Sequence, residues 1–170
     1  MNEKSAKLAI LGGFGVRVFI SLLNIIRYTQ SNMIFLNRML NAAAIIATLV
    51  IVAGFAMLYM LNQDTLDIVI CIGAGGALLN SLMVTLLNSG IGYSIYSYVS
   101  LVSGLMVIIG MGVWAYKMYK NQLTTGAAAI VLGLVLSIAS GMVGIYIISY
   151  VISIACTASY AYAAYIEYNN

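Results

Sequence analysis

The stretch AAAIIATLVIVAGFAMLYML, residues 42–61, decides the fold class of this chain. It is an uninterrupted apolar run that contains no charged side chain. A helix of about 20 residues rises about 30 Å, which matches the hydrocarbon core of a bilayer. The stretch therefore predicts a transmembrane helix.

The composition of the whole chain fits the same environment. Of its 170 residues, 64% are apolar and 6% are charged, with seven lysines and arginines against four acids. The mean hydropathy is +1.06. A soluble domain uses about 25% charged residues to cover its surface. We therefore predict a single all-helical domain, residues 1–170, that is an integral, multi-pass membrane protein surrounded by membrane lipids.

A long uncharged run follows the first span and predicts a helical hairpin. Residues 68–116 contain no charge but are too many for one crossing. The polar, glycine-containing segment NSGIGYS at 88–94 is typical of a turn. We therefore expect spans at 68–87 and 95–116.

A second uncharged run, residues 126–166, follows the polar connection KMYKNQLTT at 117–125. As a single helix it would extend about 60 Å, twice the thickness of a bilayer core. Glycines near 139–144 permit a reversal of the chain. We favour a second hairpin, with spans at 123–140 and 145–166, over one long protruding helix.

The first 40 residues differ because they contain five of the seven bases. Small and polar residues fall on one helical stripe, opposite leucine, isoleucine, valine and phenylalanine: Gly13, Arg17, Ser21, Asn24 and Tyr28. This pattern is typical of an amphipathic helix that lies in the membrane interface. We predict that arrangement for 1–40, with Arg17, Arg27 and Arg38 facing lipid headgroups. The alternative is a spanning helix with Arg17 buried against partners.

The distribution of bases bears on orientation. An excess of lysine and arginine marks cytoplasmic segments, so the N-terminus is expected on the cytoplasmic side. With five crossings, however, Lys117 and Lys120 would lie on the outer side, against the rule. The helix count therefore stays open at about five.

Several classes of function are disfavoured by the residues that the chain lacks. It has no histidine, and its acids, Glu3, Asp64, Asp67 and Glu167, lie near polar connections or chain ends. Its two cysteines have no metal-binding spacing. The few bases form no broad positive face for nucleic acid. We expect a protein that is not an enzyme, with no cofactor, no metal and no nucleic-acid partner.

Small residues recur at every fourth position in the fourth predicted span. Such a face lets two helix backbones approach closely in a membrane. It serves either as a contact with another subunit or as packing within the chain. The residues are Ala129, Gly133, Ser137 and Gly141.

Polar residues mark two further faces. One set lies in the second span: Asn80, Ser81, Thr85 and Asn88. The other set lies in the last span: Tyr146, Tyr150, Ser153, Thr157 and Tyr160. In lipid such groups need partners, so they either join helices or line a path for a solute.

These patterns favour a structural or accessory subunit that packs against other membrane subunits or copies of itself. A membrane complex, a membrane-bounded virion or a helical filament would suit such a subunit. The alternative is a channel or transporter subunit with a narrow path for a small neutral solute. The absence of an acid or base deep in the predicted spans argues against coupled transport of ions.

Overall fold

The computed structural model describes most of the chain. The backbone is described for residues 2–28, 34–87, 92–142 and 146–170, and the side chains likewise except at 26–28, 34–35, 141–142 and 146–147.

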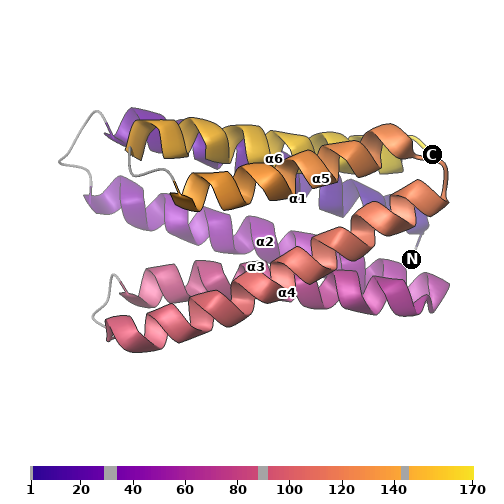
Figure 1. Ribbon diagram of the computed structural model, residues 1–170, viewed down its shortest axis with the longest axis horizontal. Helices are drawn as coiled ribbons and strands as arrows, with labels where there is room; N and C mark the ends of the chain where they lie inside the picture. The colour runs from indigo at the N-terminus through magenta and orange to yellow at the C-terminus, as the bar shows by residue number, and fades with distance from the viewer. Residues whose placement is uncertain (1, 29–33, 88–91, 143–145) are drawn as a thin grey trace.

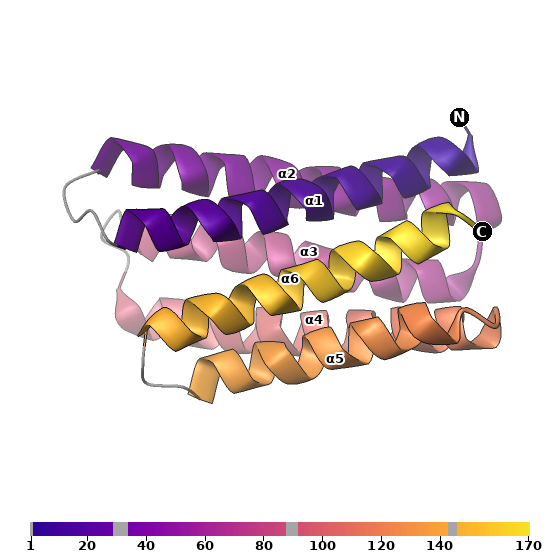
Figure 2. The same cartoon turned by 90° about the horizontal axis from the view of Figure 1, so that it is seen from above.

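The described residues form six α-helices and no strand. The helices are α1 (Glu3–Tyr28), α2 (Ile34–Asn62), α3 (Thr65–Leu87), α4 (Tyr93–Lys120), α5 (Thr124–Met142) and α6 (Tyr146–Tyr168). They run along the long axis of the molecule in alternating directions, and both termini lie at the same end (Figures 1 and 2). We call this the terminal end. The prediction of an all-helical fold is confirmed.

Each helix packs against its neighbours in sequence, and α6 also packs against α1. The last contact closes the helices into a ring. The α5–α6 contact confirms the second hairpin, since residues 126–166 fold back instead of forming one long helix.

Within the described residues, four helices are long and apolar enough to cross a membrane. The segments are Glu3–Ile25, Leu36–Asn62, Thr65–Leu87 and Tyr93–Lys120, and α5 adds a shorter apolar stretch, Thr124–Ser140. These lengths and compositions indicate a membrane protein.

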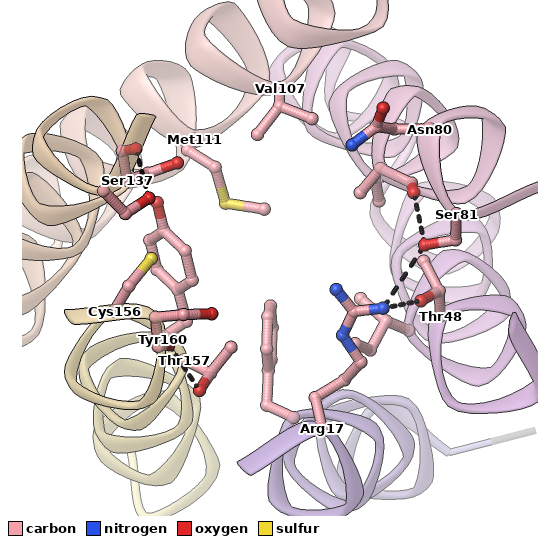
Figure 3. A pocket seen from close by; sticks show the side chains of 16 residues that line it. Arg17, Thr48, Asn80, Ser81, Val107, Met111, Ser137, Cys156, Thr157 and Tyr160 are labelled. Carbon is pink, nitrogen blue, oxygen red and sulfur yellow. Dashed lines mark hydrogen bonds between the residues drawn. The ribbon is translucent and has the colours of Figure 1, made fainter. Parts of the chain in front are cut away.

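The N-terminal segment differs from its prediction as an interfacial helix. α1 is a full member of the ring, packed between α2 and α6. Its apolar residues Val16, Phe19 and Leu22 are exposed on the outside, whereas Gly13 is buried and Arg17 points inward (Figure 3). An amphipathic stripe suits the membrane interface and a polar interior within a membrane equally well. α1 is therefore amphipathic as predicted, but its Arg17 side faces the interior of the bundle.

A close helix crossing holds the α3–α4 hairpin together. A Cβ built on Gly73 would lie 2.5 Å from the Cα of Gly110, so both positions must lack a side chain. By contrast, Gly104 and Gly112 face open space. The packing glycine of α4 is thus Gly110.

The end of α4 turns sharply into α5 through a Schellman motif. The Leu123 N–H donates to Met118 O at 2.9 Å, and the Gln122 N–H donates to Tyr119 O at 3.0 Å. Gln122 has the left-handed φ of 64° that this motif requires. The turn lies at the terminal end, so Lys117 lies at the same end as the N-terminus (Figure 1).

Candidate functional site

A cavity of about 300 Å³ lies inside the ring and is lined by residues from α1 to α6 (Figure 3). We call it the central cavity. Its polar lining residues are Arg17, Thr48, Asn80, Ser81, Ser137, Ser140, Ser153, Cys156, Thr157 and Tyr160. A polar interior enclosed by apolar helices is costly unless its groups are partnered, so it calls for a functional explanation.

Arg17 enters the cavity from α1 and is held by two hydroxyl groups. Its Nη1 donates to Thr48 Oγ1 on α2 at 3.0 Å and to Ser81 Oγ on α3 at 3.3 Å. Each hydroxyl in turn donates to a carbonyl of its own helix, Thr48 to Ala44 O at 2.7 Å and Ser81 to Ala77 O at 2.9 Å. Both hydroxyl protons are thus committed, which leaves the oxygen lone pairs directed at the guanidinium.

No acid neutralises this guanidinium within the chain. All four acids belong to the described residues, and none of them lines the central cavity or pairs with Arg17. A guanidinium stays protonated in proteins. The central cavity therefore carries a positive charge that has no counter-charge in the chain. The protein stabilises it only through hydrogen bonds to two neutral hydroxyl groups.

Tyr160 forms the wall across the cavity from Arg17 (Figure 3). Its side chain is 7% exposed, and its hydroxyl has no hydrogen-bond partner among the described residues. Gly133 on α5 makes room for the ring, because a Cβ there would lie 2.6 Å from Tyr160 Cε1. The neighbouring Cys156 thiol donates to Gly133 O at 3.2 Å. An unpaired hydroxyl is thus held at the cavity wall.

Asn80 contributes an amide to the same cavity. Its Oδ1 accepts a hydrogen bond from Ser100 Oγ on α4 at 3.3 Å. This contact turns the amide nitrogen toward the cavity interior (Figure 3). Asn80 is therefore both a helix-joining residue and a donor to the cavity.

An aromatic cluster closes the cavity toward the terminal end. Trp114 stacks on Phe14 with ring centroids 5.8 Å apart and an interplanar angle of 8°. Phe55 meets the Trp114 ring edge-on at 5.3 Å, and Tyr160 meets Phe14 at 5.8 Å. Phe14, Phe55, Trp114 and Tyr160 together make an aromatic layer. Such contacts add about 0.5–1.5 kcal/mol each beyond burial, so they stabilise the layer.

A second cavity of about 450 Å³ lies at the terminal end. We call it the terminal cavity. Its charged lining residues are Glu3, Lys7, Lys117 and Glu167. Lys117 contacts the buried Asp67 and lies 3.5 Å from Asp64 Oδ2. The Trp114 Nε1 donates to Glu167 Oε2 at 2.8 Å, so the aromatic layer is tied to the charged end.

Asp64 lies in the connection between α2 and α3. Its Oδ1 accepts the Leu66 N–H at 3.0 Å. This hydrogen bond, together with the charge of Lys117, lowers the pKa of the Asp64 carboxyl below its ordinary value. Asp64 is thus held as a carboxylate at the start of α3.

The aromatic layer separates the two cavities along the helices. On α4, Met111 lines the central cavity, Trp114 belongs to the layer and Lys117 lines the terminal cavity. Each step is about one helical turn. The same order recurs on α2 with Ile51, Phe55 and Leu58.

The predicted headgroup-facing arginines have different positions. Arg17 does not face headgroups, because its side chain is hydrogen-bonded inside the ring. Arg38 is exposed near the start of α2. Arg27 lies in the last turn of α1, but its side chain is outside the described residues.

The polar residues predicted on the second span are partly brought together. Asn80 and Ser81 line the central cavity. Thr85 lies one turn beyond and donates to Ser81 O at 3.1 Å. Asn88 lies outside the described residues.

The small-residue face of α5 packs against other helices of the same chain at the positions that are described. Ala129 is buried in the core, Gly133 packs against Tyr160, and Ser137 lines the central cavity. The side-chain surroundings of Gly141 are outside the description.

Part of the polar face predicted on α6 also lies at the central cavity. Ser153, Thr157 and Tyr160 line it. Tyr150 is half-buried, and the side chain of Tyr146 is outside the described residues.

Sequence reasoning missed Thr48, the residue that holds Arg17. It is the one serine or threonine within residues 42–61, so an isolated hydroxyl in an apolar span was the available signal. Phe14 and Trp114 were also missed, since nothing local marks two aromatic residues far apart in sequence as neighbours.

The described residues contain no group of three or more acidic, histidine or cysteine side chains placed to hold a metal ion. Comparisons of the chain with protein-family models, with curated proteins and with solved structures found no match.

Proposed function

We propose that this chain is a membrane transport protein that binds a small polar solute in its central cavity. One observation carries the proposal: polar side chains from five of the six helices, all except α4, converge on one cavity, while large apolar side chains cover the outside. Phe19, Ile46 and Leu132, for example, are each more than half exposed and suit a lipid surface. A helix bundle needs no such polar interior for stability alone, since buried polar groups in lipid are costly.

The proposed transport function favours six membrane crossings with both termini on one side. Lys4, Lys7, Lys117 and Lys120 then lie at the terminal end, against Arg27 and Arg38 near the opposite end. The positive-inside rule assigns the terminal end to the cytoplasm. This also removes the conflict that five crossings create for Lys117 and Lys120. Cysteines introduced at Asn2 and Asn170 should react with an impermeant thiol reagent from the same side of sealed vesicles.

The aromatic layer favours a carrier over an open pore. It lies between the central and terminal cavities, and passage of a solute past the stacked rings would require Phe14 to separate from Trp114. Carriers expose a central site to one side at a time by moving one group of helices against another. Movement of α4 relative to α1 would open this layer.

The predicted assembly role rested on the small-residue face of α5 and on the polar faces of α3 and α6. Because Ala129 and Gly133 pack inside the chain, the α5 face lends the assembly role no specific support. The cavity is the better guide to function.

Reconstitution into liposomes tests the proposal. Purified protein should give solute uptake that saturates with concentration and exceeds the uptake of protein-free liposomes, with a panel of acetate, nitrate, glycerol and urea. Ala77→Phe places a ring in the central cavity and should abolish this uptake, whereas Ala128→Phe on the exposed face of α5 should leave it intact. The absence of protein-dependent uptake for every solute, or equal uptake by the Ala77 variant, would contradict transport.

A further inference from the structure

We infer that the solute of the central cavity is a small oxyanion, bound by the free edge of the Arg17 guanidinium. The inference rests on the transport function proposed above and names its substrate class. Carboxylate, nitrate and phosphate groups share the relevant chemistry.

The free edge follows from the hydrogen bonds of Arg17. A guanidinium has five N–H donors in a fixed plane. The two donors of Nη1 point at Thr48 and Ser81. Nε and Nη2 have no partner among the described residues, and Nη2 extends toward the cavity interior (Figure 3). The N–H groups of Nε and Nη2 are parallel, and this is an arrangement that matches two oxygens of one anion.

The charge of the site favours an anion over a neutral solute. The chain offers Arg17 no carboxylate, and the hydroxyls of Thr48 and Ser81 supply only partial charges. A buried charge without a counter-charge is strongly unfavourable in a low-dielectric interior. An anion in the cavity would neutralise the guanidinium, and charge-assisted hydrogen bonds are about twice as strong as neutral ones.

A further donor lies across the cavity. Tyr160 is only 7% exposed, and its hydroxyl has no hydrogen-bond partner among the described residues. A phenol hydroxyl can donate to an oxygen of the same anion that Arg17 holds. The Asn80 amide nitrogen offers another donor from α3 (Figure 3). Donors from three walls thus surround a cavity that contains no carboxylate acceptor.

The shape of the site favours a polyatomic anion over a halide. A single spherical ion can accept from Nε and Nη2 only along two bent hydrogen bonds, whereas two oxygens of one group can accept along two straight, parallel ones. The volume of about 300 Å³ accommodates a small carboxylate, nitrate or phosphate.

The single tryptophan provides a direct readout, because Trp114 stacks on Phe14, which lines the cavity. Purified protein in nanodiscs of phosphatidylcholine is titrated with sodium acetate, sodium nitrate, sodium phosphate and sodium chloride at constant ionic strength. At least one oxyanion should change the Trp114 fluorescence in a saturable way, with an affinity at least tenfold higher than that of chloride. Equal responses to the oxyanions and chloride, or no saturable response to any anion in any lipid, would overturn the inference.

Variants connect the response to the named donors. Arg17→Gln should lower the affinity more than tenfold, Arg17→Lys should lower it severalfold because an ammonium lacks the fork, and Tyr160→Phe about threefold. Arg38→Gln removes an exposed charge and should bind as the wild type does. Unchanged affinity in a folded Arg17→Gln protein overturns the inference. If that variant fails to fold, the comparison of oxyanions with chloride in the wild type still decides.

Two further arms identify the source of the anion. A response that needs phosphatidylglycerol in the nanodisc, with no effect of free anions, keeps the oxyanion site but assigns it to a lipid headgroup phosphate. In that case the proposed transport of a solute fails and the site stands. Saturable uptake of glycerol or urea that is the same in Arg17→Gln and wild type, without anion binding, has the opposite meaning: transport stands and the oxyanion site fails.

Discussion

Arg17 Nη1 lies 3.0 Å from Thr48 Oγ1, and this contact joins the middle of two helices that are each long and apolar enough to cross a membrane. It explains how a charge is tolerated there, because the hydroxyl accepts from the guanidinium while donating to Ala44 O. It also fixes the direction of the charge, since a second hydroxyl on Ser81 holds the same nitrogen. Thr48 is therefore a positioning residue for Arg17.

Replacing Thr48 by valine tests this positioning role. Thr48→Val keeps the shape but removes the acceptor, and a hydrogen bond to a charged group contributes about 1.5–3 kcal/mol. Because Ser81 remains, we expect oxyanion affinity to fall about tenfold or somewhat less, and the thermal midpoint to fall as well, since the guanidinium loses one of its two acceptors. The readout is the Trp114 fluorescence titration. Ser159→Ala removes a hydroxyl that donates to its own helix on the outside of α6 and should bind normally. Equal affinity of Thr48→Val and wild type would contradict the role of Thr48.

Loss of Lys117 should destabilise the terminal end strongly. Asp67 is fully buried and Lys117 is its ion-pair partner, so Lys117→Met leaves a buried carboxylate without a counter-charge. Such a loss costs about 3–5 kcal/mol. Thermal unfolding followed by tryptophan fluorescence should show a clearly lower midpoint. Lys120→Met, an exposed lysine on the same helix, should shift it little. The double variant Lys117→Met/Asp67→Asn should recover part of the loss, and a failure to recover any would argue against the pair.

Gly133 should be intolerant of a methyl group, because its neighbour is the Tyr160 ring. Gly133→Ala places a Cβ 2.6 Å from that ring, so the ring or α5 must shift. We expect destabilisation of about 1–3 kcal/mol, as for overpacked cores. Gly112→Ala, at a position with open space, should be neutral or stabilising by up to about 1 kcal/mol. A thermal midpoint for Gly133→Ala equal to that of Gly112→Ala would show that Tyr160 does not pack there.

The stability of the protein should depend on the ionisation of Asp64 in acid. The Leu66 N–H and Lys117 lower the pKa of this carboxyl in the folded state. A lowered pKa contributes stability above the unfolded value of about 4, and the contribution is lost as the pH falls through the folded pKa. The thermal midpoint of the wild type should therefore fall more steeply below about pH 4 than that of Asp64→Asn. The difference should be small, because Asp64 is partly exposed and water screens its charge. Parallel curves for the two proteins would exclude the contribution.

Much of the helical framework could be predicted because apolar run length is a local property. Residues 42–61 lie within α2, and the break predicted near 88–94 agrees with the end of α3 at Leu87 and the start of α4 at Tyr93. The position of α1 in the ring differs from the interfacial position predicted for 1–40, since an amphipathic stripe does not specify whether its polar side meets headgroups or a polar interior. Helix amphipathicity alone cannot distinguish the two.

The site was only partly visible in the sequence. Asn80, Ser81 and Tyr160 stood out as polar groups in apolar spans, and they line the central cavity. Their meeting with Arg17 depends on the α1–α6 contact that closes the ring, which joins the two ends of the chain. Contacts at such separation leave no periodic signal in one sequence, so the cavity itself could not be predicted.

The central claim is that Arg17 gives a solute-accessible central cavity its positive charge, and Cys156 in the cavity wall can report on it. In a Cys71→Ala background, the rates of Cys156 modification by an anionic and a cationic methanethiosulfonate are measured and normalised to their rates with a free thiol. We predict that the anionic reagent reacts faster by about tenfold, as expected for one charge at short range in a partly desolvated site, and that Arg17→Gln removes the preference. Modification of Cys156 by neither reagent, or a preference for the cationic one, would contradict the account.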